Sequence, residues 1–446
     1  MSSRTFQQGG HIPHFKSDTE HLPIVILPVP ERVIIPLSQH IGAPCDPLPD
    51  VQVGDRVIAG QPIGMGKGLC APVHASVSGV IEAIEERPHV CNRNIMSIVI
   101  RCEGDEGYGR IADMGIDELS ASEILDVIGH AGIVGMGGAG FPTRVKLSPP
   151  PHKPIDTILL NGAECEPFLT ADHRYMLEYG GDVILGLQAA MKATAARQAF
   201  IGIEDNKPDA IAHLQSLTAQ DERISVVPLE TKYPQGGEKQ LIYSILRREV
   251  PSGGLPMDVG AIVQNIGTAV AIAEAVKWRK PLIERVVTVS GPGAVHKGNF
   301  MARIGTPLSF LLDHCGVPRD AGVRVIVGGP MTGVIQKDWD APVIKTTGGV
   351  LAFTPEFGRR EQPYSDCVRC GKCVEQCPMY LYPNDLGLLA EADRIGELDR
   401  RHILDCIECG LCSYVCPSHR PIVQFVKLAK PAVWEHRNRL AAGLRR

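Results

Sequence analysis

The pattern of apolar and polar positions divides the chain into successive parts. Between Arg32 and Arg101, short apolar alternations are separated by turns, as in Val51-Gln-Val-Gly-Asp-Arg-Val-Ile, which is typical of short β-strands. From Ser120 onward, helical and strand-like runs alternate, which predicts an α/β domain. Strand-like runs with Gly-Pro turns return from Arg285 to Thr332, and cysteines punctuate the chain after Tyr364. The pattern therefore predicts several domains of different class.

The α/β part has a clear beginning. Ser120-Ala-Ser-Glu123 is a capping box, which predicts a helix through about His130. The most apolar segment, residues 260–276, contains Gln264, Asn265 and Glu274, so we interpret it as a helix of a soluble protein and not as a membrane span. The remaining runs predict a strand over 155–160, a helix over 182–197 and a strand over 199–204.

Composition and charge narrow the class of protein. The chain has 446 residues, of which 44% are hydrophobic and 21% charged, so several domains with large cores are expected. Its net charge of -5 and the lack of a basic arm argue against nucleic-acid binding. The start, Met1-Ser-Ser-Arg-Thr-Phe-Gln-Gln, has no apolar core of a signal peptide, so we expect a cytosolic protein or one on a membrane surface.

The strongest chemical signal is a pair of four-cysteine runs. Residues 367–378 and 406–417 each follow C-x2-C-x2-C-x3-C-P, the run with which bacterial ferredoxins bind two [4Fe–4S] clusters. Three thiolates on a tight loop reach one cluster, and the fourth crosses to the other. We therefore predict one cluster on Cys367, Cys370, Cys373 and Cys416, and a second on Cys406, Cys409, Cys412 and Cys377.

Two other uses of these cysteines fit the pattern less well. Zinc sites use two CxxC pairs, not two four-cysteine runs that each end in proline. Disulfides require an oxidising compartment, which the N-terminus does not indicate. The other cysteines show no paired spacing and are predicted to be mostly buried thiols; they are Cys45, Cys70, Cys91, Cys102, Cys165 and Cys315.

A glycine-rich segment runs from Gly135 to Lys146. It fits G-x-G-x-x-G literally, but a dinucleotide fingerprint needs a strand before it and a continuing helix after it. Here a predicted helix comes first and Pro142 follows. Bare backbone N–H groups and a following lysine suit a flavin phosphate, while an ordinary packed turn is the alternative.

Residues 33–101 resemble the flattened β-sandwich of biotinyl and lipoyl carriers. Those carriers attach their group to a lysine at a hairpin tip. The corresponding hairpin here, His74-Ala-Ser-Val77, has no lysine, so we interpret this part as a structural or docking module.

The order of the remaining motifs is similar to that of one family. The 135–146 loop, the Asn161–Pro167 run, the Tyr233–Glu238 turn and the Asn265/Thr268 pair recur in the flavin-binding NADH dehydrogenase subunit of respiratory complex I and its relatives. Among these, the chain most resembles the C subunits of Rnf (Rsx) electron-transport complexes. The likeness covers essentially the whole chain, including 9–16 and 37–44.

The resemblance implies a multidomain α/β and α+β architecture. The expected parts are an extended lead-in (1–31), a carrier-like β-sandwich or barrel-sandwich hybrid (32–102), an FMN/NADH-binding domain of complex I type (115–280), a β-grasp SLBB module (284–333), a two-cluster bacterial ferredoxin-like helical domain (359–425) and a basic C-terminal tail (426–446).

The resemblance also implies roles for individual residues. The four glycines of the loop would let FMN approach the backbone, and four polar residues would contact its phosphate and ribityl chain. Four further residues would face the nicotinamide nucleotide. Hydride chemistry would belong to FMN, so no catalytic acid–base pair is expected. The loop glycines are Gly135, Gly137, Gly138 and Gly140. The residues expected at the phosphate and ribityl chain are Lys146, Asn161, Asn265 and Thr268, and those expected to face the nicotinamide nucleotide are Phe141, Glu164, Glu166 and Glu238.

The sequence also departs from the complex I pattern. Ala163-Glu164 replaces Asp-Glu, and Gly236-Gly237-Glu238 replaces Gly-Glu-Glu, which affects the expected adenine-side contacts of NADH more than those of FMN. FMN is expected to be non-covalent because no flavinylation signal is present.

The resemblance implies a peripheral subunit on the cytoplasmic face of the inner membrane. It would pass electrons between NAD(H), FMN and two [4Fe–4S] clusters, while membrane and iron–sulfur partner subunits carry out ion transport, because this chain has no spanning segment of its own. A cobalamin reductase of the propanediol-utilisation type is an alternative, although its sandwich follows the clusters. A relay or scaffold subunit without NADH oxidation is another.

The C-terminal stretch from Pro421 to Arg446 predicts a helix that breaks near Pro431. Its basic residues suit either a solvated helix or contact with anionic lipid or a membrane partner; they are Arg437, Arg439, Arg445 and Arg446.

Overall fold

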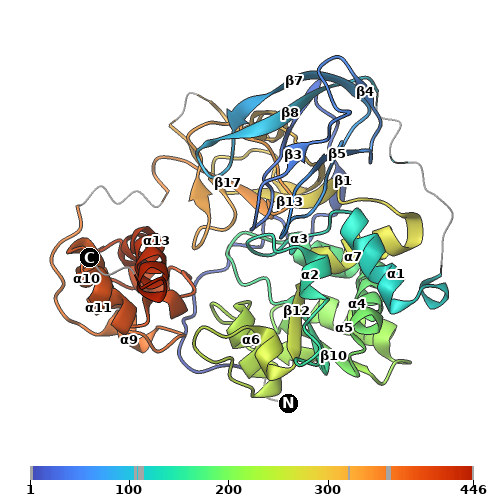
Figure 1. Ribbon diagram of the computed structural model, residues 1–446. Helices are drawn as coiled ribbons and strands as arrows, with labels where there is room; N and C mark the ends of the chain where they lie inside the picture. The colour runs from blue at the N-terminus through green and yellow to red at the C-terminus, as the bar shows by residue number, and fades with distance from the viewer. Residues whose placement is uncertain (1–3, 105–107, 109–114, 320–321, 358–362, 444–446) are drawn as a thin grey trace.

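The first part of the chain is extended and lies across two later domains. The computed structural model describes residues 4–104, 108, 115–319, 322–357 and 363–443 (Figure 1). Single bridges pair Arg4 with Leu229 and Gly10 with Tyr233. Strand β1 (Ile24–Ile26) pairs in parallel with β14 (Gly298–Arg303). The extended lead-in therefore also supplies an edge strand to a distant sheet.

The carrier-like part forms two small sheets around one apolar core. The sheet orders are β2-β8-β7-β4 and β3-β5-β6, and the enclosed side chains include Val33, Ile63 and Ile98. The 74–77 hairpin is buried, and the Ser76 hydroxyl donates to the Ile304 carbonyl oxygen (2.5 Å), so this hairpin docks against another domain. The strands are β2 (Arg32–Pro36), β3 (Asp46–Pro47), β4 (Arg56–Val57), β5 (Pro62–Met65), β6 (Val73–His74), β7 (Gly79–Pro88) and β8 (Asn94–Cys102).

The α/β part is a parallel four-stranded sheet with helices on both faces. Its strand order is β11-β10-β9-β12. Because the strands are buried on both sides, Leu160 packs in the core beneath α1, α3, α4, α5 and α7, whereas Leu159 faces α6. The strands are β9 (Thr157–Gly162), β10 (Gln198–Glu204), β11 (Ile224–Leu229) and β12 (Ala261–Asn265).

The helices of this domain follow the predicted order. The Ser120 capping box is present, with both of its reciprocal hydrogen bonds. The helices are η1 (Ile116–Glu118), α1 (Ala121–His130), α2 (Thr143–Lys146), α3 (Ala171–Glu178), α4 (Gly180–Thr194), α5 (Pro208–Thr218), α6 (Glu238–Leu246), η2 (Pro256–Val259) and α7 (Ile266–Trp278).

The prediction of a single helix over 260–276 was wrong at its beginning. Residues 261–265 form β12, and the helix starts only at Ile266, where Asn265 is the N-cap. A short apolar run of this length fits a fully buried strand as well as a helix, and pairing with β9 decides between them.

The next part is a mixed six-stranded sheet of order β1-β14-β13-β17-β15-β16. Strand β17 (Gly349–Phe353) lies beyond residue 333, the expected end of this module, yet it pairs with both β13 and β15. Helix α8 (Leu308–His314) packs on the sheet. The other strands are β13 (Glu284–Ser290), β15 (Arg324–Val327) and β16 (Val334–Ile335).

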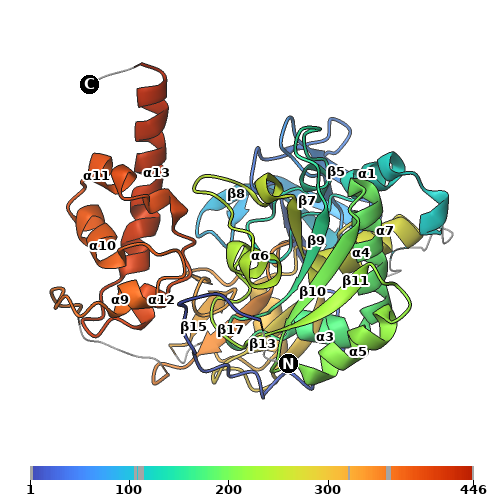
Figure 2. The same ribbon diagram turned by 90° about the horizontal axis from the view of Figure 1, so that it is seen from below.

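The cysteine-rich part is helical and lies to one side of the other domains (Figure 2). Helix α13 (Ile422–Ala441) packs on two shorter helices, and its C-terminal end extends away from the molecule. The other helices are α9 (Lys372–Glu375), α10 (Pro383–Glu391), α11 (Ile395–Arg400), η3 (Ile403–Asp405) and α12 (Leu411–Tyr414).

The predicted break near Pro431 was wrong, because α13 is continuous through it. A proline inside a helix costs roughly 3 kcal/mol. Val426, Ala429 and Val433 are buried on both sides of the proline, and this packing holds the helix together. Arg437 and Arg439 lie on the exposed end, and Arg445 and Arg446 fall outside the described residues.

Among the described residues, none of the helices combines the length and the apolar character that crossing a bilayer requires.

Candidate functional site

Two asparagines lie side by side at the carboxyl edge of the parallel sheet. Asn161 in β9 and Asn265 in β12 are register partners. The Asn161 amide donates to the Gly236 carbonyl oxygen (2.8 Å). Asn265 accepts from the Thr268 N–H (3.3 Å), and so caps α7. This edge is where parallel α/β sheets place their ligands.

The glycine-rich loop after α1 is held against this edge. The Gly135 N–H donates to the Phe141 carbonyl oxygen (2.9 Å), which closes the loop. The Met136 N–H donates to the hydroxyl of Thr268 (2.9 Å), whose side chain is fully buried. Thr268 therefore positions the loop through its hydroxyl.

The other glycines of the loop differ in their surroundings. A Cβ on Gly137 would lie 2.8 Å from the Asn265 amide nitrogen, and Gly140 has a positive φ of +72° beside the backbone of His40. A Cβ on Gly138, by contrast, would have no atom within 4 Å. Gly138 therefore borders open space at the ligand edge, as a loop that lets a flat cofactor approach requires.

Lys146 brings a positive charge to the same edge. It lies in α2, and its ammonium donates to the Val263 carbonyl oxygen in β12 (2.8 Å). Glu238, at the start of α6, lies 3.4 Å from this ammonium and is 43% exposed. A partly exposed cation at this edge fits a phosphate, and the open space at Gly138 fits a flat cofactor, so these residues fit FMN.

Glu164 and Glu166 are bonded within the protein. Glu164 accepts from the N–H groups of Asp172 (3.0 Å) and His173 (3.4 Å) at the start of α3. Glu166 accepts from the Met331 N–H (3.1 Å) and the Thr332 hydroxyl (2.6 Å). Burial raises the pKa of Glu166. Of the three carboxylates expected to face the nucleotide, Glu238 is the exposed one.

Sequence reasoning missed two ionisable residues here, the buried Lys16 and the half-buried Asp172. The Lys16 ammonium donates to the carbonyl oxygens of Glu166 and Leu169, and tethers the lead-in to the site. Asp172 accepts from the Asn265 amide (2.7 Å). Burial, together with the charge of Glu164, raises the pKa of Asp172 to about 7. The only feature of the sequence that could have indicated Asp172 is its place as an acidic residue in the first turn of the helix that follows residues 164–167.

The raised pKa of Asp172 predicts a pH-dependent stability. Between about pH 4 and pH 7 the folded chain retains this proton and the unfolded chain releases it, so stability falls as pH rises. Asp172→Asn keeps an oxygen that accepts from Asn265 and removes the titration. Its melting temperature relative to wild type should therefore rise between pH 5 and pH 8, measured by differential scanning fluorimetry.

Asp209→Asn is the matched control. Burial alone would raise the pKa of Asp209, but hydrogen bonds from His173 and the Ala210 N–H hold it below its ordinary value. This variant should lose stability relative to wild type as pH rises through the acidic range. The same trend in both variants would contradict the assignment of Asp172.

The structure gathers the first predicted set of cysteines around one cavity. The cavity has a volume of about 330 Å³ and is lined by Cys367, Cys370, Cys373 and Cys416, together with Asn384 and Arg420. Three of the cysteines come from one run and the fourth from the other. This enclosure by thiols from two loops fits a cubane cluster.

The second set also comes together. Burial raises the pKa of Cys412, and negative charges on the neighbouring Cys406, Cys409 and Cys377, and on Cys373 of the first set, would raise this pKa further. Burial raises the pKa of Cys409 to about 12. Thiols whose pKa is raised in this way need a neighbouring cation to become thiolates, and the iron of a cluster would supply it.

The second set contacts the domain that holds the glycine-rich loop. The Tyr233 hydroxyl donates to the Cys409 carbonyl oxygen (2.7 Å), and the Gln240 amide donates to that of Pro378 (3.2 Å). The same loop also contacts the six-stranded-sheet part: Gly410, with a φ of +80°, packs against the Met331 carbonyl oxygen, and a Cβ on Gly410 would lie 2.7 Å from that oxygen. The turn that begins at Tyr233 thus contacts both Asn161, at the carboxyl edge of the parallel sheet, and the loop of the second cysteine set. Sequence reasoning missed this contact.

Three family models match successive parts of the chain. The family model described as the RnfC barrel sandwich hybrid domain matches residues 4–105. The Nuo51 FMN-binding domain matches residues 128–274, and the 4Fe-4S dicluster domain matches residues 366–420.

Full-length relatives match almost the whole chain. The C subunit of the Na(+)-translocating ferredoxin:NAD(+) oxidoreductase complex of Acetobacterium woodii is 44% identical over 443 residues, which is 98% of each chain. The C subunit of the proton-translocating ferredoxin:NAD(+) oxidoreductase complex of Clostridium ljungdahlii is 46% identical over 431 residues, 96% of this chain and 93% of the relative. A solved NAD+-reducing [NiFe]-hydrogenase in the H2-reduced state overlaps 71% of this chain and 63% of its own, with 19% identity and a TM-score of 0.48.

An FMN-binding α/β domain next to a dicluster domain defines an electron-transfer iron–sulfur flavoprotein. The RnfC-specific sandwich and the two relatives narrow this class. The chain belongs to the RnfC family, the C subunits of ion-translocating ferredoxin:NAD+ oxidoreductase complexes. This confirms the resemblance found in the sequence and favours it over the cobalamin reductase alternative.

Proposed function

We propose that this chain passes electrons between NAD(H), a non-covalent FMN and two [4Fe–4S] clusters within its complex. The observation that carries the proposal is the hydrogen bond from the Tyr233 hydroxyl to the Cys409 carbonyl oxygen (2.7 Å). It joins the turn beside the proposed flavin site to the loop of the second cysteine set. The cofactor that exchanges hydride and the cofactor that takes single electrons would thus be neighbours.

The residues at the sheet edge would bind FMN in distinct ways. Gly138 leaves room for it, and Lys146 offers its ammonium to the phosphate. Asn161 and Asn265 would contact the phosphate or ribityl chain, while Thr268 and the other glycines hold the loop in position. When bound, FMN supplies the exchange between a hydride and single electrons that neither NADH nor a cluster supplies alone.

The nicotinamide nucleotide would approach from the exposed side of this edge. Phe141, Glu164, Glu166 and Glu238 remain the proposed residues of that side. Glu238 has the strongest support because it is exposed at a helix start beside Lys146. Glu164 and Glu166, bonded within the protein, would shape the site through α3 and the loop around Met331.

The two ligand sets predicted from the sequence are proposed for the clusters. The cluster on Cys406, Cys409, Cys412 and Cys377 would be nearer to the flavin, and the cluster on Cys367, Cys370, Cys373 and Cys416 would be the distal one. The cavity lined by the distal set and the contact of Tyr233 with the proximal loop support this order.

The domain boundaries proposed here follow the sequence with two changes. The lead-in, sandwich, FMN/NADH, SLBB β-grasp and ferredoxin-like parts keep their expected starts. The SLBB module would extend to Phe353, because β17 pairs with β13 and β15. Helix α13 would belong to the ferredoxin-like domain instead of a separate tail after 425, because it packs in that domain's core.

The chain would sit peripherally on the cytoplasmic face of the inner membrane, bound to membrane and iron–sulfur subunits that carry out ion transport. Its relatives are named as subunits of ion-translocating complexes, which supports this location.

Two substitutions separate the flavin side from the nucleotide side. Lys146→Ala should lose FMN because it removes the cation that balances the phosphate. Glu238→Gln should retain FMN and lower kcat/KM for NADH about ten- to a hundredfold, as expected for one hydrogen bond to a charged group. FMN released by acid and NADH oxidation with ferricyanide measure the two effects.

Comparing FMN content and NADH kinetics between the two variants tests which residues face the flavin and which face the nucleotide. Loss of FMN in Glu238→Gln with unchanged NADH kinetics per bound flavin would reverse the two sides of the site. Wild-type protein with FMN bound that never oxidises NADH would favour a relay or scaffold role.

A further inference from the structure

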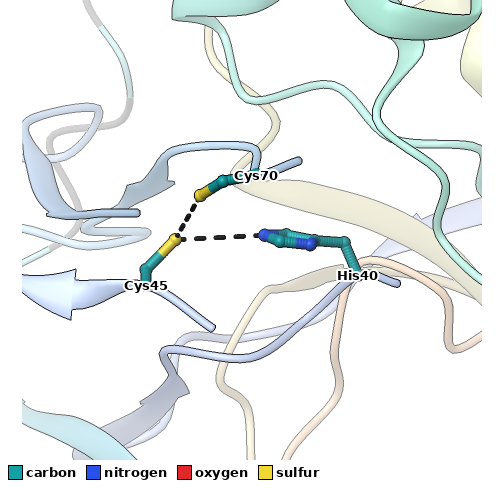
Figure 3. Close-up of side chains that lie close together, drawn as sticks. All are labelled: His40, Cys45 and Cys70. Carbon is teal, nitrogen blue, oxygen red and sulfur yellow. Dashed lines mark hydrogen bonds between the residues drawn. The ribbon is translucent and has the colours of Figure 1, made fainter. Parts of the chain in front are cut away.

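Two cysteines and a histidine of the barrel-sandwich part meet at one point, although they are distant from the cluster runs. The Sγ atoms of Cys45 and Cys70 lie 3.1 Å apart. The Nε2 atom of His40 lies 3.9 Å from the Cys45 Sγ, and the three ligand atoms are within 4.8 Å of one another. Figure 3 shows the three side chains converging, with dashed lines from the Cys45 sulfur to the Cys70 sulfur and to the His40 ring. The spacing of these cysteines along the chain did not predict that they would meet.

We propose that His40, Cys45 and Cys70 bind a zinc ion that fastens the sandwich to the glycine-rich loop. Two thiolates and one neutral imidazole are ligands that Zn²⁺ prefers. A fourth position is open to water, because His40 and Cys70 are only partly buried while Cys45 is buried.

The distances fit this ion after a small adjustment. Tetrahedral zinc, with bonds of about 2.3 Å to sulfur and about 2.0–2.1 Å to nitrogen, separates two sulfurs by about 3.8 Å and sulfur from nitrogen by about 3.6 Å. The two sulfurs would therefore move apart by about 0.7 Å, and the imidazole nitrogen would approach the Cys45 sulfur by about 0.3 Å and the Cys70 sulfur by up to about 1.2 Å. Side-chain rotation suffices for movements of this size.

The imidazole is oriented for metal binding. Its Nδ1 lies 3.1 Å from the Ile41 carbonyl oxygen, to which it donates when it carries the proton. This hydrogen bond leaves Nε2 without a proton, 3.9 Å from the Cys45 sulfur, and a backbone carbonyl commonly orients a metal-binding histidine in this way. Nε2 now accepts from the Ala71 N–H (3.1 Å), and zinc would replace that partner.

The third ligand distinguishes a metal from a disulfide. A disulfide uses only the two sulfurs and gives no role to an imidazole nitrogen that lies beside them. The His40 segment is also held in place from outside: the Ile41 N–H donates to the Ala139 carbonyl oxygen (3.1 Å) in the glycine-rich loop. Zinc here would fix the position of residues 40–45 and, through Ile41, of that loop.

The test uses the full chain, purified without air and with its clusters in place. Inductively coupled plasma mass spectrometry should find about one zinc and about eight irons per chain. Cys45→Ser and Cys70→Ser should each lose the zinc and keep the iron. Cys315→Ser is the matched control: this thiol is buried in the core of another domain, and its variant should retain zinc.

Two further measurements identify the ligands. X-ray absorption at the zinc edge should show two sulfur neighbours and nitrogen or oxygen neighbours. Amide exchange at Ile41 should be faster in Cys70→Ser than in Cys315→Ser. Zinc retained equally by Cys45→Ser and wild type would overturn the proposal, because the ion would then bind elsewhere. Wild type without zinc would overturn it as well, whether alkylation finds Cys45 and Cys70 as free thiols or as a disulfide.

Discussion

Gly138→Val is expected to abolish FMN binding and, with it, NADH oxidation, while the fold and the iron content remain unchanged. The valine side chain would extend into the open space at the sheet edge, where no protein atom lies within 4 Å of a Cβ at this position. The protein can accommodate the side chain, but the cofactor cannot share the space with it. FMN released by acid, iron content and the circular dichroism spectrum measure the three parts of this prediction.

The control is a glycine with the same free surroundings at another site. Gly181, in α4, also has no atom within 4 Å of an added Cβ. Gly181→Val should retain wild-type FMN content, and a modest loss of stability is expected because β-branched residues are weaker helix formers than alanine. Equal FMN in Gly138→Val and Gly181→Val would place the flavin away from this loop.

Removal of a crossing cysteine is expected to disturb the cluster of the other run. Cys416→Ala takes away one of the four thiols that line the cavity with Cys367, Cys370 and Cys373, so the distal cluster should be lost or convert to a form with fewer irons. Cys377→Ala should do the same to the proximal cluster. Electron paramagnetic resonance of the reduced protein, with iron analysis, shows which cluster remains.

The two variants should also differ in their effect on electron flow. Without the proximal cluster, electrons from the flavin would have no near acceptor, so reduction of the distal cluster by NADH should slow markedly in Cys377→Ala. Cys416→Ala should leave the proximal cluster reducible. Loss of the local cluster in each case, instead of the other one, would show that the fourth cysteines do not cross.

Local signals were sufficient to predict several parts of the molecule. The capping box at Ser120 defines its helix by itself, because its donors and acceptors are only three residues apart. The spacing within the first cysteine run predicts that Cys367, Cys370 and Cys373 share a cavity, and the ferredoxin pattern adds Cys416 from the other run. The domains of the sandwich, flavin and dicluster type were predicted through the resemblance, and the family models confirm them.

Contacts between distant segments could not be predicted in the same way. Cys45 and Cys70 are 25 residues apart in the sequence. They meet because Cys45 precedes β3 and Cys70 follows β5, and these two strands pair antiparallel. Tyr233 and Cys409 meet across 176 residues. The break expected at Pro431 failed for a related reason: burial against other helices outweighs a local preference that the sequence displays plainly.

The most direct test of the account counts the electrons that the chain delivers to NAD+. The protein, with FMN and both clusters, is reduced anaerobically with a low-potential reductant, freed of the excess and mixed with NAD+. Two electrons stored at the flavin site and one at each cluster should form about two NADH per chain. About one NADH would contradict a link between the clusters and the flavin, and none would contradict the proposed NAD(H) site.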